Sequence, residues 1–355
     1  MTEATVLVPR PDDWHVHLRD DEMLQAVVDH TARWYRHALV MPNLTPPITT
    51  AAGAQAYRSR ILEAASVGEE TFMPVMSLYL TQDLDIVDLL AGWQAGVVGA
   101  VKFYPAGATT NSEAGGTNLL DFEPTLAAMA EHQIPLLVHA ESTDPAIDIF
   151  AREAAFLEQQ VGPLLAHMPE LSVTVEHIST AAGIDLVHEF DQAYGSITPH
   201  HLSCDRSDIL ANGMRPELYC KPVINSADNR RALVAAATSG SPKFFLGTDS
   251  APHPLSQKEA RVAKAGIFNA PYGLEVTAEV FHSAGSLEHF AGFVSVNGAL
   301  RYGYEPSRDQ LMLTRRESTD TLNLAETLTT AAGDEVRLFG LAEATLWTVS
   351  EVAEL

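Results

Sequence analysis

The chain has 355 residues, 46% of them hydrophobic, and carries 22 Lys and Arg against 46 Asp and Glu, a formal net charge of −24. A field of that sign repels nucleic acid and anionic lipid, so neither is an expected partner. No uninterrupted apolar stretch is long enough to span a membrane, and the N-terminus has an early acidic residue without the apolar segment of a secretory signal.

The two cysteines, Cys204 and Cys220, lack the spacing of metal ligands. Together with the missing signal, they favour a reduced, cytoplasmic compartment. The length allows two domains, but barrels of this size often form one. If the substrate is an anion, an acidic chain of this kind must supply positive charge locally at its site.

Short β-rich apolar runs alternate with longer stretches of helical periodicity such as residues 21–34, 123–132 and 181–194. Eight strand–helix units predict an α/β fold, a (β/α)₈ TIM barrel. An open doubly wound sheet is the alternative, but no glycine-rich phosphate turn follows any run. The runs cover residues 6–18, 36–43, 71–80, 96–105, 133–142, 171–180, 195–204 and 243–253.

After the last run the chain reads as further helix and then, from about residue 305, as a short strand-rich C-terminal extension. No composition shift marks a domain boundary there. We therefore expect residues 1–355 to form a single barrel domain with this extension.

Polar residues gather at the C-terminal ends of the apolar runs. In a TIM barrel these ends form one face, and that face carries the active site. Residues far apart in the sequence are therefore predicted to meet at one mouth. They are His15, His17, Asn43, Lys102, His139, His177 and Asp249.

His15 and His17 stand two residues apart, so on a strand they share a face and can bind one metal ion. Each of His139 and His177, taken alone, could be an ordinary buried histidine. Four imidazoles at one barrel mouth instead favour a centre for zinc or a related transition metal. Asp249 could be a ligand, a general base or both, or an N-cap of the following segment.

Two further features of the predicted mouth have open interpretations. A lysine inside an apolar strand is unfavourable unless it is paired or neutralised. Lys102 could form a salt bridge at the barrel rim, or its amine, with a pKa lowered by burial and nearby cations, could react with carbon dioxide to give a carbamate that bridges two metals. His200 and His201 could also be ligands, but we interpret them as structural or as supports of the ligand residues, because the ligand set is complete without them.

Seven motifs together resemble the dihydroorotases of the bacterial, free-standing type, in the amidohydrolase superfamily. The resemblance extends from residue 13 to about residue 302. The motifs are "DWHVHLRD", "MPNLTPP", "KFYPAGATTNS", "LLVHAE", "EHIS", "YCKP" and "FFLGTDSAPH".

The resemblance implies the reversible cyclisation of N-carbamoyl-L-aspartate to L-dihydroorotate and water, the third step of pyrimidine synthesis. It also implies two zinc ions per subunit. His15 and His17 would bind one ion and His139 and His177 the other. Lys102, carboxylated to N6-carboxylysine by carbon dioxide, would bridge the two, and Asp249 would complete the first site and carry the proton.

The resemblance also implies a set of substrate contacts. Arg19, Asn43 and His253 would hold the free carboxylate, with Arg19 offering a bidentate guanidinium fork. Without the resemblance, Arg19 could equally form a surface ion pair with Asp20 or Asp21.

Further contacts are implied around the rest of the substrate. Lys221 and Ala265 would contribute backbone groups, and His17 and His139 would border the substrate. Thr109 and Thr110 lie in a loop of small polar residues, 105–116, that would close over it.

The resemblance further implies a homodimer. Two alternatives remain for the function. One is another cyclic-amide hydrolase of the hydantoinase or dihydropyrimidinase type, which would not need three groups for a substrate carboxylate. The other is a non-catalytic scaffold barrel, which should have lost metal ligands.

Overall fold

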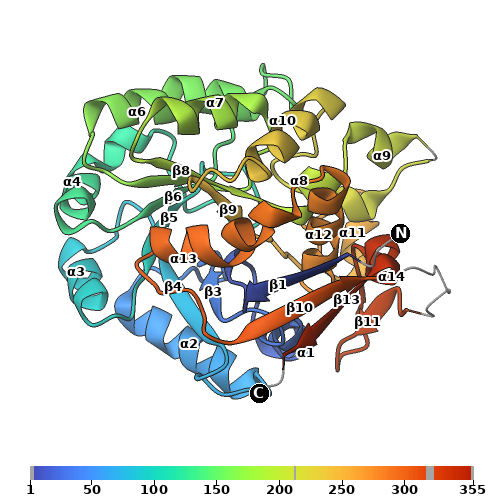
Figure 1. Cartoon of the computed structure of the whole chain (residues 1–355). Coiled ribbons are helices and arrows are strands. Elements are labelled where there is room, and N and C mark those ends of the chain that lie inside the picture. Colours follow the sequence, from blue (N-terminus) through green and yellow to red (C-terminus); the bar gives the residue numbers. More distant parts are fainter. Residues whose placement is uncertain (1–3, 212, 317–323, 353–355) are drawn as a thin grey trace.

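Figure 1 shows a computed structural model of the chain, which describes residues 4–211, 213–316 and 324–352. The last three residues of the predicted extension, 353–355, lie outside the described residues. Eight parallel strands form one sheet in sequence order, which confirms the predicted (β/α)₈ barrel. They are β2 (Asp13–Val16), β3 (His37–Val40), β4 (Met73–Tyr79), β5 (Ala100–Phe103), β6 (Leu136–Val138), β7 (Val173–Val175), β8 (Ala193–Ile197) and β9 (Phe244–Leu246).

The barrel closes where the first strand meets the segment after the last one. The backbone N–H of His17 donates to the carbonyl of Ser250 at 3.0 Å, and that of Asp249 donates to the carbonyl of His15 at 2.8 Å. The closure therefore uses the segments that carry candidate ligands.

Helices lie outside the strands (Figure 1). Side chains cap several of them: Thr50 accepts from the N–H of Gly53 at the start of α2, and Asp85 accepts from that of Val87 at the start of α3. The helices are α1 (Asp21–Ala32), α2 (Ala51–Ala64), α3 (Ile86–Gln94), α4 (Glu123–His132), α5 (Arg152–Phe156), α6 (Gly162–His167), α7 (Ala181–Glu189), α8 (Pro199–Ser203), α9 (Arg206–Leu210), α10 (Ala227–Ala237), α11 (Leu255–Lys258), α12 (Gly273–Ser283), α13 (Asn297–Arg301) and α14 (Leu341–Leu346).

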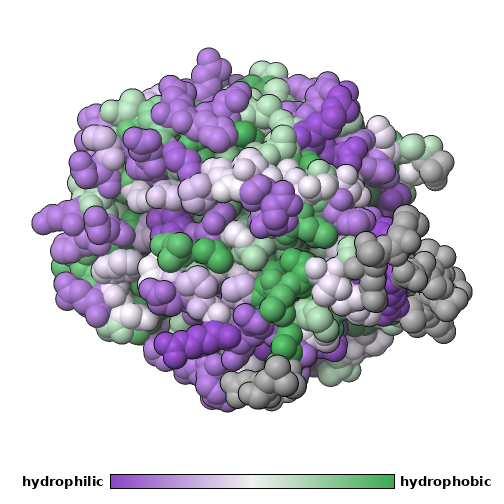
Figure 2. Space-filling view, in the orientation of Figure 1, coloured by the Kyte–Doolittle hydropathy of each residue, from purple (hydrophilic) through white to green (hydrophobic). Residues whose placement is uncertain are grey.

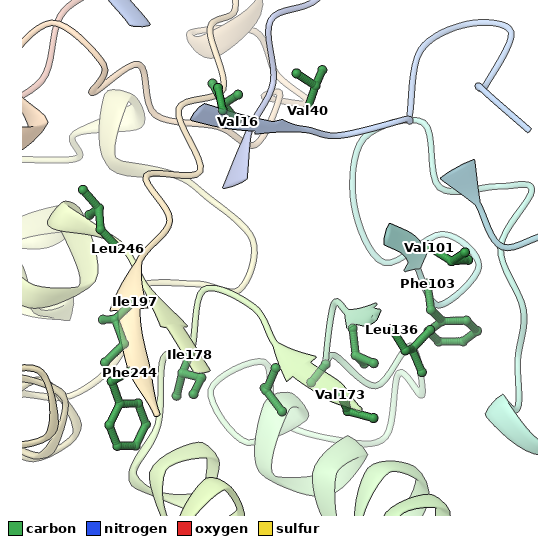
Figure 3. Packing of buried hydrophobic residues seen from close by; sticks show 14 of the residues in the cluster. Val16, Val40, Val101, Phe103, Leu136, Val173, Ile178, Ile197, Phe244 and Leu246 are labelled. Carbon is green, nitrogen blue, oxygen red and sulfur yellow. The ribbon is translucent and has the colours of Figure 1, made fainter. Parts of the chain in front are cut away.

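The pleat of each strand divides its side chains between two apolar clusters. Val40 and Phe244 belong to the large cluster shown in Figure 3, whereas their neighbours Leu39 and Phe245 belong to a smaller one. Because interior and exterior positions alternate along barrel strands, the large cluster lies under the helices and the small one fills the barrel. Lys102 follows the small-cluster residue Ala100 by two positions, so the same alternation turns it inward.

Aromatic rings join the smaller cluster to the chain that follows the last barrel strand. Trp14 is 1% exposed. Its ring stacks on Tyr302 at 4.6 Å and on His37 at 5.8 Å between centroids, and Tyr304 lies 5.8 Å away. The residues just after α13 thus complete the barrel core.

The first apolar run, expected to hold one strand, forms two. β1 (Thr5–Pro9) ends at a proline and a second proline, Pro11, follows before β2 begins. Proline lacks the N–H that a continuous strand would donate, so the run breaks there. β1 instead pairs with β10 (Gln310–Arg315), which pairs with β13 (Trp347–Glu351).

This three-stranded sheet lies beside the barrel (Figure 1), and a hairpin of β11 (Thr327–Thr329) and β12 (Glu335–Arg337) accompanies it. Leu7 and Met312 are cross-strand partners and are 50% and 38% exposed. Figure 2 shows apolar residues gathered where β1 and β10 run, on a face that is otherwise largely hydrophilic. Among the described residues, no helix is long and apolar enough to cross a membrane.

The contact between Gly298 and Trp14 gives a test of this packing. A Cβ added at Gly298 would overlap the buried Trp14 ring. Gly298→Ala should therefore lower the free energy of unfolding by about 1–3 kcal/mol, as overpacking of a core does. Urea denaturation measures it. Gly292→Ala is the matched control, because a Cβ there would be 3.6 Å from the nearest atom. It should change the free energy of unfolding little. Equal stability of the two variants would contradict this view of the core.

Candidate active site

A cavity of about 20 Å³ at the C-terminal mouth of the barrel gathers most of the predicted site residues. Residues from the ends of strands β2, β3, β5, β6, β7 and β9 and from the intervening loops meet there. Of the predicted set, Lys102 and His253 are not part of its lining. The lining consists of His15, His17, Arg19, Asn43, Tyr104, Thr109, Thr110, His139, His177, Lys221, Asp249, Ala251, Ala265 and Gly266.

Three donor atoms in this cavity form a nearly equilateral triangle. Nε2 of His15 lies 3.3 Å from Nε2 of His17, and Oδ1 of Asp249 lies 3.3 Å from the first and 3.1 Å from the second. A tetrahedral ion with bonds of about 2.0–2.1 Å has ligand atoms about 3.3–3.4 Å apart. The triangle therefore fits three ligands of one divalent metal ion.

A second pair of donors lies beside the triangle. Nδ1 of His139 is 3.1 Å from Nε2 of His177. The other nitrogen of His139, Nε2, is 3.1 Å from Oε2 of Glu141, and the amine of Lys221 donates to Oε1 of the same carboxylate. Because a carboxylate only accepts, it fixes the proton of His139 on Nε2 and leaves Nδ1 free to bind a metal.

Lys102 is fully buried, and its amine contacts Oε2 of Glu176. The other oxygen, Oε1, lies 2.9 Å from Nδ1 of His15. A salt bridge therefore exists, but in the interior and not at the rim. Burial lowers the pKa of Lys102, and Glu176 opposes that shift. A buried amine next to two sets of metal donors fits the carbamate interpretation as well.

The cavity holds ionised carboxylates beside imidazoles. Burial opposes charge on Asp249, but His15 and His17 outweigh it and hold its pKa well below the usual range. Burial also opposes charge on His15, yet Glu176 and Asp249 raise its pKa to about 9, whereas burial lowers the pKa of His17 to about 4. A group of negative oxygens and imidazole nitrogens of this kind is suited to a cation.

Three of the site residues have left-handed backbone: Arg19, His177 and Asp249, with φ of 59°, 41° and 46°. This region is uncommon for residues with a Cβ and is often found at functional sites. Buried Asp13 supports one of the turns. Its carboxylate accepts from the N–H and the hydroxyl of Thr248, at 2.8 and 2.6 Å, and from the N–H of His15.

Arg19 forms no ion pair within the described part of the chain. Its Nε donates to the carbonyl of Pro252 at 3.1 Å, and its Nη2 lies 3.0 Å from Nε2 of His253. Burial and the guanidinium lower the pKa of His253 to about 2, so the imidazole stays neutral. The alternative of a surface pair with Asp20 or Asp21 is wrong, because the guanidinium of Arg19 makes these two contacts instead and Asp20 pairs with Arg60 at 2.7 Å.

The loop 105–116 lies across the cavity. The side-chain amide of Asn43 donates to the carbonyl of Thr110 at 2.9 Å, and that of Asn111 donates to the carbonyl of Asn43 at 3.1 Å. On the opposite wall, the carbonyl of Ala265 lies 3.0 Å from Nε2 of His253. Asn43 thus touches both the cavity and the loop.

His200 and His201 lie on α8, away from the cavity lining. Together with Cys220 they bring three potential ligand atoms within 4.8 Å of one another. Both ring nitrogens of His201 already have partners, the hydroxyl of Thr198 at 2.9 Å and the carbonyl of Pro222 at 3.1 Å. These contacts support a structural role for His201.

Sequence reasoning assigned no role to Glu141, Glu176 or Asp13. Each stands within two residues of a predicted ligand, in "HAE", "EH" and "DWH". An acidic residue adjacent to a ligand histidine was the available signal. The sequence could not show which histidine each carboxylate would reach: Glu176 precedes His177 but contacts His15.

Comparisons with known proteins give a consistent assignment. Residues 7–307 match the amidohydrolase family. A dihydroorotase of Synechococcus sp. (strain CC9605) is 51% identical over 308 residues, which are 86% of this chain and 88% of that protein.

Two solved structures are similar over nearly the whole chain. A dihydroorotase from Campylobacter jejuni has a TM-score of 0.86 at 32% identity, covering 99% of this chain and 98% of that one. A dihydroorotase from Saccharomyces cerevisiae in complex with 5-fluoroorotic acid has a TM-score of 0.88 at 29% identity, covering 99% and 100%.

The contact between Glu141 and His139 generates a test. Glu141→Leu removes the acceptor that fixes the His139 proton, so the affinity for a metal ion at the His139 and His177 pair should fall about 10–100-fold. Glu141→Gln keeps an acceptor oxygen and should retain most of the affinity. The metal content that remains after dialysis against increasing chelator concentrations measures the affinity of both variants. If Glu141→Leu keeps as much metal as the wild-type protein, Glu141 does not support metal binding by His139.

Proposed function

The chain belongs to the amidohydrolase family, and we propose that within it this protein is a dihydroorotase, which closes N-carbamoyl-L-aspartate to L-dihydroorotate and water and catalyses the reverse reaction. Curated relatives at about 50% identity over most of the chain support this activity. The reaction is the formation or hydrolysis of a cyclic amide. It supplies the ring of the pyrimidines.

The observation that carries the substrate assignment is the unpaired guanidinium of Arg19 at the edge of the metal donors. Within the described residues it meets only a backbone carbonyl and a neutral imidazole. A partly buried cation without a counter-ion is unfavourable, so the site is complementary to a ligand that brings a carboxylate. Both proposed substrates carry a free carboxylate that is not part of the reacting amide.

The two alternative functions fit the site less well. A hydantoinase-type enzyme acting on a neutral ring would leave Arg19 without an anion. A scaffold barrel should have lost ligands, yet His15, His17, His139 and His177 and the carboxylate of Asp249 all converge.

We further propose that the site binds two zinc ions and that Lys102 carries a carbamate made from carbon dioxide. The triangle of His15, His17 and Asp249 supports the first ion, and the pair of His139 and His177 supports the second. Zinc held by these residues would supply Lewis-acid chemistry, which would polarise the ring amide carbonyl and lower the pKa of a water molecule. The buried amine of Lys102 is the group that a carbamate bridge requires.

Asp249 is proposed to carry the proton. Its contacts with His15 and His17 both use Oδ1, which leaves Oδ2 to take a proton from the attacking water and to give it to the leaving ring nitrogen. The low pKa of this carboxyl keeps it ionised and ready to accept. The cyclisation runs through the same transfers in the opposite order.

The remaining predicted contacts are proposed to orient the substrate. Arg19, Asn43 and His253 would hold the free carboxylate, and Thr109 and Thr110 would cover it. Arg19 contacts His253, and Arg19 and Asn43 both line the cavity. Ala265 and Lys221 both line the cavity and would contribute backbone groups. The amine of Lys221 is bound to Glu141. His17 and His139 would border the substrate next to the metals.

A homodimer and a cytoplasmic location, both expected from the sequence, remain proposals.

Asp249→Ala removes the proposed proton carrier. Turnover in both directions should fall by about 10²–10⁴-fold, the usual contribution of general acid–base catalysis, while much of the metal stays bound. Ring opening and ring closure assayed alongside metal analysis decide this. Near-normal rates in the variant would show that Asp249 does not carry the proton.

Arg19→Met keeps much of the volume and removes the guanidinium. The Michaelis constant should rise about 10–100-fold, since each charge-assisted hydrogen bond contributes about 1.5–3 kcal/mol. Arg60→Met, which removes a neighbouring guanidinium paired with Asp20, is the matched control and should leave the constant nearly unchanged. If both variants behave alike, the carboxylate is held elsewhere.

A further inference from the structure

A second, larger cavity lies on the outer side of the loop that covers the active site. Its volume is about 390 Å³, and it is lined by loop residues 107–111 and 113, by Thr143, Arg152 and Tyr219, and by residues 221 and 262–265. Four residues line both cavities: Thr109, Thr110, Lys221 and Ala265. These four residues form the wall between the outer cavity and the active site.

The inner cavity has little free space and shares a wall with the loop 105–116. A volume of about 20 Å³ holds roughly one water molecule. Thr109 and Thr110 of the loop line this cavity, and the contacts of Asn43 with Thr110 and Asn111 hold the loop there. A substrate must pass a wall that this loop helps to form.

The outer cavity is cationic, although the whole chain has a net charge of −24. Arg152 and Lys264 line it, and neither has an ion-pair partner within residues 4–211, 213–316 and 324–352. Among the described residues, the side chain of Arg152 donates one hydrogen bond, from Nε to the carbonyl of Ile147 at 3.3 Å. Lys221 adds a third cation, paired with Glu141, and Glu113 is the one acidic residue of the lining.

Another cavity also adjoins the active site, but its charges differ. It has a volume of about 450 Å³ and shares Arg19 and Asn43 with the inner cavity. Its lining contains Asp20 and Asp21 beside Arg19 and Arg60, so its formal charges cancel. A dianion is therefore attracted more strongly to the cavity of Arg152 and Lys264.

We propose that this cavity, lined by Arg152, Lys264 and Lys221, is a reception site where the dicarboxylate substrate binds transiently before the loop 105–116 opens. This inference rests on the proposed function. Concave cationic walls raise the local concentration of an anion even when the rest of the protein repels it. From there the substrate passes Lys221 and reaches Arg19, so the cations mark a path from solvent to the site.

The charge of the lining can be changed without touching the proposed catalytic groups. The double variant Arg152→Gln with Lys264→Gln should lower kcat/KM for N-carbamoyl-L-aspartate about 10-fold at low ionic strength and leave kcat unchanged. Its kcat/KM should also depend less steeply on salt. Glu113→Gln should act in the opposite direction and raise kcat/KM about twofold. Arg231→Gln, at an exposed position of α10, is the control and should leave kcat/KM unchanged.

The two substrates provide an internal check. N-carbamoyl-L-aspartate has two carboxylates and L-dihydroorotate has one. Because the interaction scales with ligand charge, the logarithm of the loss should be about twice as large for the dianion. An equal loss for both, or a loss in kcat, would indicate structural damage and overturn the proposal.

The outcomes separate the two levels of inference. If the wild-type protein turns over both substrates but the double variant keeps its kcat/KM and salt dependence, the reception site is wrong and the function stands. If Arg60→Gln lowers kcat/KM and the double variant does not, access runs through the other cavity. If the wild-type protein with zinc turns over neither substrate, the proposed function fails, and the reception site with it.

Discussion

The site depends on one constraint: several ionisable groups are buried together and must neutralise one another. Glu176 lies between the amine of Lys102 and the ring of His15, and Asp249 lies against His15 and His17. Removing charges from water is unfavourable by several kcal/mol per ion unless each finds a partner. The barrel meets this requirement because its strand ends aim these side chains at one small volume. The same arrangement leaves donor atoms spaced as a metal ion requires.

A second set of contacts holds those groups in place. Asp13 fixes Thr248 and thereby the turn that carries Asp249, while Glu141 fixes the proton of His139. Strained backbone at His177 and Asp249 is maintained by hydrogen bonds to neighbouring strands. Precise placement matters because a ligand displaced by about 1 Å no longer fits a metal ion. The residues around the ligands therefore belong to the function as much as the ligands do.

Charge is distributed in a way that suits an anionic substrate on an acidic protein. The outer face in Figure 2 is largely hydrophilic, and the acidic excess repels anions at long range. Arg19 inside the mouth, and Arg152 with Lys264 outside the loop, lack carboxylate partners among the described residues. These local cations, and not the net charge, decide whether a dicarboxylate can approach and bind.

The sequence by itself determined the barrel, because alternating strand and helix periodicities and polar strand ends are local patterns. It also placed His15, His17, His139, His177 and Asp249 at one mouth, since the ends of parallel strands must meet. Only the tertiary structure decided which atoms face one another. Glu176 contacts His15 across the barrel, Lys221 turns its amine to Glu141, and the first apolar run divides at its prolines so that β1 joins a strand some 300 residues later. Such pairings depend on the closure of the barrel and on side-chain directions, and no local pattern encodes them.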